Sequence, residues 1–381
     1  MAELDTITIK GFKSIASIEK LKLGAINVVI GPNGSGKSNF IGAFALLKAL
    51  RAGRLQAYAG KVGVGNLLYF GPKVTDALQF GLAFHGDGGR RYSVRLEPGM
   101  NTDLLPVAET ATQGGTGETD DAAPDDKDPV GSVSERLRRH GGEAGLSDQA
   151  SLGPVARWVA WQVDEWLICH FHDTSEFSKM RLPCAVDDNR RLRADGGNLP
   201  AFLYMLQKQH PTAYSLIRRT VQRVVPFFDD FILAPSGLHP DKIKLEWRHR
   251  DQDQYFDAWA LSDGTLRFIA LATLFLQPKT LRPPLVLVDE PELGLHPFAI
   301  TLLGAMVKSA SVDTQVILAT QSPLLLDEFS PEDVLVAERD GHATTFRRLD
   351  ANSLEIWLED YSLGELWEKN HLGGRPKAWL A

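Results

Sequence analysis

The sequence predicts an α/β fold with a mostly parallel core sheet, and three observations support this class. Apolar runs at residues 25–30 and 285–288 have the composition of strands buried on both faces. A glycine-rich turn joins the first run directly to a segment with helical spacing of apolar residues, which begins at Ser38. Further predicted strands alternate with predicted helices to the end of the chain. This alternation favours helices packed on a parallel sheet.

Composition limits the functional classes that fit the chain. With 48 acidic residues against 41 lysines and arginines, the formal net charge of −7 excludes a generic polyanion binder, so a nucleic-acid surface would have to be local. Cys169 and Cys184 lack metal-ligand spacing. We interpret them as structural thiols in a protein of a reducing compartment. The N-terminus lacks a signal pattern and no apolar run is long enough for a membrane helix. We therefore expect a cytoplasmic protein with no membrane partner.

The elements follow one another in a clear order. Strands are expected at 6–9 and 25–30, then a helix from Ser38, then strands of a smaller β-rich lobe at 67–70, 77–84 and 92–96. Residues 110–128, rich in Gly, Thr and Asp, predict a flexible loop. Helices are expected at 199–206, 213–225 and 264–276, and strands at 243–247, 285–288, 316–319, 334–338 and 344–349.

Four regions result from this order. Residues 1–100 hold the N-terminal half of the core and the β lobe, and 101–150 a flexible acidic insertion. Residues 151–260 hold a return strand and a helical lobe. Residues 261–381 hold the C-terminal half of the core and its tail.

The glycine-rich turn fits the phosphate-loop pattern of two fixed glycines followed by a lysine and a hydroxyl residue. Its backbone N–H groups would curl around the phosphates of a nucleotide such as ATP, and the N-terminus of the following helix adds to the attraction. Lys37 is expected to reach the β and γ phosphates, and Ser38 to bind Mg²⁺. The strand before and the helix after favour this interpretation over an ordinary glycine turn. The residues are Gly31, Pro32, Asn33, Gly34, Ser35, Gly36, Lys37 and Ser38.

Two adjacent carboxylates end the apolar run at 285–288, where parallel sheets present their ligand-binding edge. Asp289 would hold Mg²⁺ and Glu290 would act on the attacking water as the catalytic base. A solvated acidic strand end is the alternative. Residues Ser262, Asp263 and Gly264 open a predicted helix and could bind a phosphate at its N-terminus, although an ordinary capping sequence fits the same spacing.

The order of these motifs resembles the ABC-type ATPase heads of the SMC and RecF class. Residues 319–323 (Ala-Thr-Gln-Ser-Pro) and the opening Lys-Gly-Phe-Lys-Ser at 10–14 belong to the same resemblance. Residues 289–297, 363–367 and 372–376 are similar to stand-alone bacterial AAA-type ATPases related to the OLD and RecF groups. The resemblance covers nearly the whole chain apart from the flexible loop.

The resemblance implies further roles. Lys13, Ser14 and Asn39 would add nucleotide contacts, and Gln321 would take a catalytic position as the switch residue. An ATP-dependent head-to-tail homodimer is implied, in which Ser262, Asp263 and Gly264 of one copy act in trans on the ATP of the other. His296 would stand at the D-loop position.

Three of these positions depart from the common ABC pattern. Asp263 stands where Gly is usual, and a carboxylate near a γ-phosphate should weaken closure unless it caps backbone amides. His296 falls where a D-loop aspartate is usual. Gln321 replaces a histidine and cannot take up a proton, so slow turnover is expected.

These expectations combine into an ATP hydrolase that acts as an ATP-driven switch in DNA maintenance or anti-phage defence. OLD-like relatives often work with a TOPRIM-type nuclease, and because the chain ends soon after the predicted core, a separate nuclease partner is expected. A non-hydrolysing ATP-sensing scaffold and the nucleotide-binding subunit of a transporter remain alternatives. Two arginine clusters could contact nucleic-acid phosphates or be solvated surface charge: Arg190, Arg191 and Arg193, and Arg218, Arg219 and Arg223.

Overall fold

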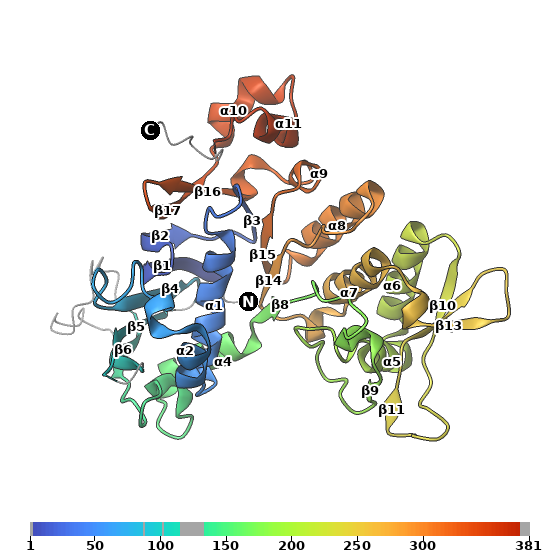
Figure 1. Cartoon of the computed structure of the whole chain (residues 1–381), viewed down its shortest axis with the longest axis horizontal. Helices are drawn as coiled ribbons and strands as arrows, with labels where there is room; N and C mark the ends of the chain where they lie inside the picture. The colour runs from blue at the N-terminus through green and yellow to red at the C-terminus, as the bar shows by residue number, and fades with distance from the viewer. Residues whose placement is uncertain (1–2, 87, 101–102, 115–132, 374–381) are drawn as a thin grey trace. The chain divides into compact units, whose positions relative to one another are not determined.

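The computed structural model describes residues 3–86, 88–100, 103–114 and 133–373 (Figure 1). The chain forms two compact units. Unit 1 consists of Met1–Trp166, Pro331–Glu355 and Lys369–Ala381, and unit 2 of Leu167–Ser330 and Ile356–Glu368. The predicted phosphate loop belongs to unit 1, whereas the predicted carboxylates and the predicted anion-binding helix belong to unit 2.

An antiparallel sheet in the order β2-β1-β4-β5-β6-β7 forms the β lobe of unit 1. Its strands alternate buried and partly exposed residues, as expected for a sheet with one covered face. Helices contact the buried face (Figure 1). The elements are β1 (Leu4–Phe12), β2 (Ile15–Lys22), β4 (Leu78–Phe84), β5 (Arg91–Pro98), β6 (Leu104–Gln113), β7 (Val133–Arg136), α1 (Lys37–Arg51), α2 (Leu55–Val62), α3 (Val64–Leu67) and α4 (Pro154–Glu165).

Three further strands of unit 1 position the phosphate loop. The strand before the loop, β3 (Ile26–Ile30), is buried along its whole length and pairs in parallel with β16 (Val334–Asp340). On the other side of β16, β17 (Ala343–Arg348) pairs antiparallel. The loop after β3 therefore emerges beside the turn that joins β16 to β17.

Unit 2 contains a second parallel arrangement, in which β14 (Leu285–Asp289) pairs with β15 (Gln315–Thr320) on one side and β8 (Leu167–Cys169) on the other. The parallel pairs of both units confirm the predicted α/β class. The helices of unit 2 are α5 (Leu199–Gln209), α6 (Pro211–Val224), α7 (Asp263–Leu276), α8 (Pro297–Ala310), α9 (Pro323–Leu326) and α11 (Leu363–Glu368), and α10 (Ala351–Leu358) crosses the boundary between the units. Short antiparallel pairings join β10 (Phe228–Ile232), β12 (Glu246–His249) and β13 (Tyr255–Asp257), and β9 (Cys184–Ala185) with β11 (Lys242–Ile243).

The structure corrects several predicted elements. The strand expected at 67–70 is wrong, because the backbone turns through Gly63 at φ +86° into the short helix α3 and only Leu68 makes an isolated bridge, to Phe12. The flexible loop expected from residue 110 begins too early, because β6 continues to Gln113 and pairs with β5 and β7. Residues 115–128 of that loop lie outside the described residues. The strand expected at 243–247 is divided between β11 and β12.

Two other features concern the cysteines and the helices. Both cysteines, Cys169 and Cys184, are free thiols. Among the described residues, no helix combines the length and the apolar character that crossing a membrane requires.

Phe44 is the most informative core position for a test of unit 1, because it is fully buried on α1. Its ring centroid lies 5.4 Å from that of Phe40 and 5.5 Å from that of Trp166. We expect Phe44→Ala to lower the free energy of unfolding in urea by about 3–5 kcal/mol, since it leaves a cavity among packed rings. The same substitution at the exposed Phe177 should change it by less than about 0.5 kcal/mol. Equal losses at both positions would contradict this packing argument.

Candidate functional site

The predicted phosphate loop lies between the end of β3 and the start of α1, and its lysine folds back over it. Lys37 Nζ donates hydrogen bonds to the carbonyl oxygens of Gly31, at 2.6 Å, and Pro32, at 3.1 Å. The lysine is only 6% exposed. A positive charge is thus held within the loop, beside the backbone N–H groups that begin the helix.

The two fixed glycines are required by close packing. A Cβ on Gly31 would collide with Ala337 O of β16, and a Cβ on Gly36 would collide with Thr344 Oγ1 of β17. Gly36 also has a φ of +109°, in the region that favours glycine. Strands β16 and β17 therefore constrain the backbone near the two ends of the loop.

Polar side chains from distant segments brace the same loop. Thr344 Oγ1 lies 2.7 Å from Ser14 Oγ and 2.8 Å from Ser35 O. Asn39 Nδ2 donates to Ser14 Oγ at 2.7 Å. The structure thus brings Ser14 and Asn39 to the loop. Thr344 is an addition that sequence reasoning missed, because it lies 330 residues from Ser14.

Lys13 precedes this network on the turn between β1 and β2, with φ +50°. Its ammonium lies 5.3 Å from the Phe12 ring centroid, and burial lowers the pKa of the lysine below its usual value. Arg339 is a second addition, because its Nε donates to Gly34 O at 3.1 Å. Arg339 is therefore a second cation, besides Lys37, in direct contact with the loop.

One buried polar atom of the loop has no partner among the described residues. Ser35 is 1% exposed, and its Oγ accepts or donates no hydrogen bond there. A buried hydroxyl without a partner is costly unless a ligand or water completes it. The loop therefore fits an anionic group that receives hydrogen bonds, which is what the phosphates of a nucleotide provide.

In unit 2, β14 ends at the predicted carboxylates. Asp289 pairs with Ala319 of β15, and the next residue, Glu290, donates its N–H to Ala319 O at 2.8 Å. Glu290 adopts φ +43°, an uncommon conformation for a residue with a side chain. Gln321 Nε2 donates to Glu290 Oε1 at 3.1 Å. The structure thus brings together two of the predicted catalytic residues, one from the end of each parallel strand.

Glu292 is a further carboxylate at this strand end. Its Oε1 accepts a hydrogen bond from the fully buried Thr320 Oγ1 at 2.6 Å, while its Oε2 is buried with no partner among the described residues. Burial raises the pKa of Glu292 above its usual value. Sequence reasoning assigned this residue no role. The only available signal was its place in the acidic run after β14.

The predicted anion-binding turn begins α7 in unit 2. Ser262 is the N-cap, and its Oγ accepts from Thr265 N at 3.1 Å. Gly264 packs directly on the loop after β14, since a Cβ there would collide with Gly294 O. Arg267, buried one turn along α7, donates to Phe171 O at 2.9 Å and also to Leu293 O. The start of α7 and the loop after β14 are therefore held together by close packing and hydrogen bonding.

His296, predicted for the D-loop position, caps the next helix. Its Nδ1 accepts from Phe298 N at 3.2 Å at the start of α8, and the residue is exposed. A helix cap accounts for this contact without any further role.

The arginine clusters are partly neutralised. Arg193 pairs with Asp188 at 2.6 Å and Arg218 with Asp230 at 2.9 Å. These pairs favour solvated surface charge over a phosphate-binding patch, because paired arginines contribute less positive potential.

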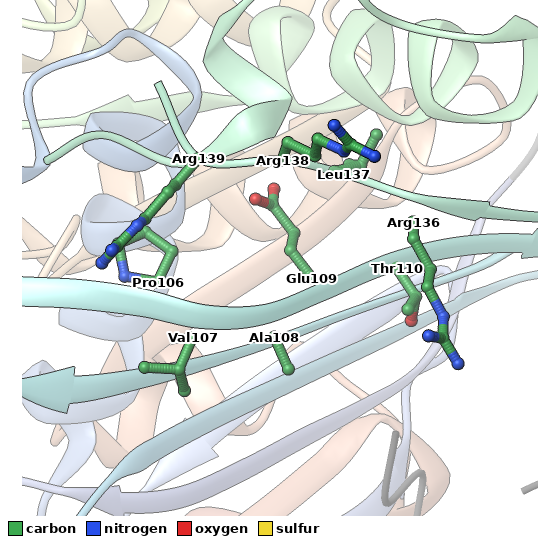
Figure 2. Close-up of a pocket in the computed structure, with 9 residues that line it drawn as sticks. All are labelled: Pro106, Val107, Ala108, Glu109, Thr110, Arg136, Leu137, Arg138 and Arg139. Carbon is green, nitrogen blue, oxygen red and sulfur yellow. The ribbon is translucent and has the colours of Figure 1, made fainter. Parts of the chain in front are cut away.

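A separate cavity of about 520 Å³ lies in unit 1 between β6 and residues 136–139 (Figure 2). Figure 2 shows Glu109 pointing from β6 toward the segment that carries Leu137 and Arg138. The carboxylate of Glu109 accepts from Tyr92 Oη at 2.7 Å and from the backbone N–H groups of Gly145 and Leu146. Burial raises the pKa of Glu109. The hydrogen bonds of the Glu109 carboxylate are therefore satisfied within the chain. We interpret this cavity as a structural feature of unit 1 and not as a binding site.

Comparison with known proteins gives matches over most of the chain. The model of the family described as "AAA domain, putative AbiEii toxin, Type IV TA system" matches residues 26–327. A segment of 37 residues is 65% identical to the chromosome partition protein Smc of Desulfitobacterium hafniense, and it covers 9% of this chain and 3% of that protein. The chain therefore corresponds to a small part of that curated relative.

Two solved structures are similar in fold. One is described as the SmcHead bound to the C-winged helix domain of ScpA, with a TM-score of 0.60, and the other as the Smc head domain with an extended coiled coil bound to the C-terminal domain of ScpA from Pyrococcus furiosus, with a TM-score of 0.58. Each is 15% identical to this chain. The similarity covers 92% and 94% of this chain and 99% of each of the two solved chains.

Proposed function

The chain belongs to the AAA-domain family, and from that premise we propose that it binds ATP with Mg²⁺ and hydrolyses it between two copies of itself. Its fold is that of an ABC-type ATPase head, as the match to the Smc heads shows. The observation that carries the proposal is the loop around Lys37, where a buried ammonium rests on the carbonyl oxygens of Gly31 and Pro32 beside the unpartnered hydroxyl of Ser35.

The residues of unit 1 bind the nucleotide in this proposal. The N–H groups of residues 31–38 donate to the phosphates, and Lys37 exchanges its loop carbonyls for phosphate oxygens. Ser38 and Asp289 would hold Mg²⁺, which when bound would neutralise phosphate charge. Lys13, Ser14 and Asn39 add contacts to the nucleotide, and the hydrogen bonds of Asn39 and Thr344 with Ser14 support this role for Ser14 and Asn39.

The residues of unit 2 carry the chemistry. Glu290 accepts a proton from the attacking water, and Gln321 holds that carboxylate in place. The 3.1 Å hydrogen bond between their side chains supports this assignment. The uncommon backbone of Glu290 agrees with strain stored at a reacting position. Since Gln321 cannot accept a proton itself, we propose a slow turnover.

The second copy completes the site in this proposal. The start of α7, with Ser262, Asp263 and Gly264, approaches the γ-phosphate held by the other copy, and His296 lies at the edge of that interface. The negative charge of each γ-phosphate is then fully stabilised only when the N-terminus of α7 from the other copy contacts it. The resulting cycle of association and release would serve DNA maintenance or anti-phage defence, with a separate TOPRIM-like nuclease as partner.

Turnover should therefore depend on protein concentration. We expect phosphate release per subunit to rise with concentration over a roughly hundredfold range, because only associated copies are competent. EDTA should abolish the release, since Mg²⁺ is required, and sedimentation should show association only with ATP. A high rate per subunit that is independent of concentration would contradict a shared site.

A further inference from the structure

Arg181 is a buried arginine of unit 2 that sequence reasoning did not single out. Its side chain is 6% exposed. It donates from Nε to Thr174 O at 3.0 Å, and from Nη1 to Leu261 O at 3.2 Å and to Ala258 O. The two bonds from Nη1 tie the guanidinium to the backbone immediately before α7. The turn that precedes Ser262 is thus shaped around this one side chain.

The remaining contact of Arg181 is with a charge. Its Nη2 lies 2.7 Å from Asp263 Oδ1, and the carboxylate of Asp263 is 67% exposed. The exposed ring of Trp259 lies beside the guanidinium, with 5.9 Å between its centroid and Cζ. A buried guanidinium needs a compensating charge, and Asp263 is the carboxylate with which it forms an ion pair among the described residues.

Asp263 poses a problem for anion binding at this helix. A carboxylate in the first turn stabilises a helix, but it repels a phosphate that approaches the same N–H groups. With Arg181 bound, the pair carries no net charge, so the N-terminus of α7 keeps its attraction for an anion. Although Asp263 stands where glycine is usual, its pairing with Arg181 removes the repulsion between its carboxylate and a phosphate at the start of α7.

We propose that Arg181 is a positioning residue, which cancels the charge of Asp263 and fixes residues 258–263 so that this turn can meet the γ-phosphate held by a second copy. The inference rests on the proposed function, and it adds a residue that touches neither nucleotide nor metal. A purely structural role for Arg181 makes a different prediction. In that case the charge of Asp263 would not influence the effect of removing Arg181.

The test is a double-mutant cycle read out by association. Sedimentation velocity with Mg²⁺ and the non-hydrolysable analogue AMP-PNP gives the association constant of the full chain. We expect Arg181→Met to weaken association by about tenfold or more, because Asp263 is left uncompensated, and Asp263→Asn to strengthen it by about twofold to tenfold. The double variant should associate at least about threefold more tightly than Arg181→Met, because neutrality is restored although the bonds of Arg181 to the backbone are not. Lys179→Met, which removes a nearby exposed charge paired with Asp195, should leave association unchanged.

Folding and nucleotide binding are measured separately in each variant. Affinity of the unassociated chain for the analogue depends on the loop in unit 1, so it should be the same in the parent and all four variants. If Arg181→Met does not fold, Asp263→Asn decides alone, and weaker association in that variant overturns the inference. A double variant no better than Arg181→Met also overturns it. A parent that neither binds the analogue nor associates overturns the proposed function first, and this inference with it.

Discussion

Lys37→Ala should reduce the affinity of the chain for ATP by about 10- to 100-fold, the effect of losing a charged hydrogen-bond donor to phosphate. In the described structure the ammonium already lies inside the loop, 2.6 Å from Gly31 O. Binding therefore needs only a local exchange of acceptors, from carbonyl to phosphate oxygen. Isothermal titration calorimetry with saturating Mg²⁺ measures the change.

The control is a lysine of the same unit with no part in the loop. Lys61 is exposed on α2, and Lys61→Ala should bind ATP as the parent does. Circular dichroism should show that both variants are folded. If the parent takes up no ATP, or Lys37→Ala matches it, the assignment of the loop to a nucleotide is wrong.

Glu290→Gln should lower the rate of phosphate release by about 10²- to 10⁴-fold while ATP binding persists, because an amide cannot accept the proton of the attacking water. The substitution preserves the shape of the side chain and an oxygen that can accept from Gln321. It also leaves the backbone preference at φ +43° nearly unchanged. The expected signature is a loss of turnover with ATP-dependent association retained or prolonged.

Glu292→Gln is the matched comparison, because it makes the same change two residues further along. Its oxygen can still accept the hydrogen bond from Thr320, so we expect less than about a tenfold loss in the rate. Equal rates for the parent and Glu290→Gln would remove the catalytic role of Glu290. Such a result would favour the non-hydrolysing scaffold.

Local patterns predicted the parts of the site that are contiguous in sequence. The apolar strand β3, the glycine turn and the start of α1 follow each other without interruption, so composition and spacing sufficed to identify them. The acidic end of β14 was recognisable for the same reason. Gln321 was singled out only through the resemblance to ATPase heads, and its hydrogen bond to Glu290 was not predicted.

Contacts between distant segments were beyond the reach of pattern reasoning. Thr344 meets Ser14 across 330 residues, Arg339 meets Gly34 across 305, and Arg181 meets Asp263 across 82. Composition also misled at β6, where residues such as Thr110 suggested a loop. In the sheet, Thr110 Oγ1 lies 2.7 Å from Ser93 Oγ, so cross-strand pairing outweighs the polar composition.

The bare contact between Gly264 and Gly294 has a mechanical consequence. No side chain lies between the two backbones, and Arg267 at the start of α7 donates a hydrogen bond to the carbonyl of Leu293. A shift in the loop after β14 should therefore move the first turn of α7 with it. If the first turn of α7 contacts the nucleotide of a second copy, hydrolysis at one ATP would be coupled to the conformation around the other.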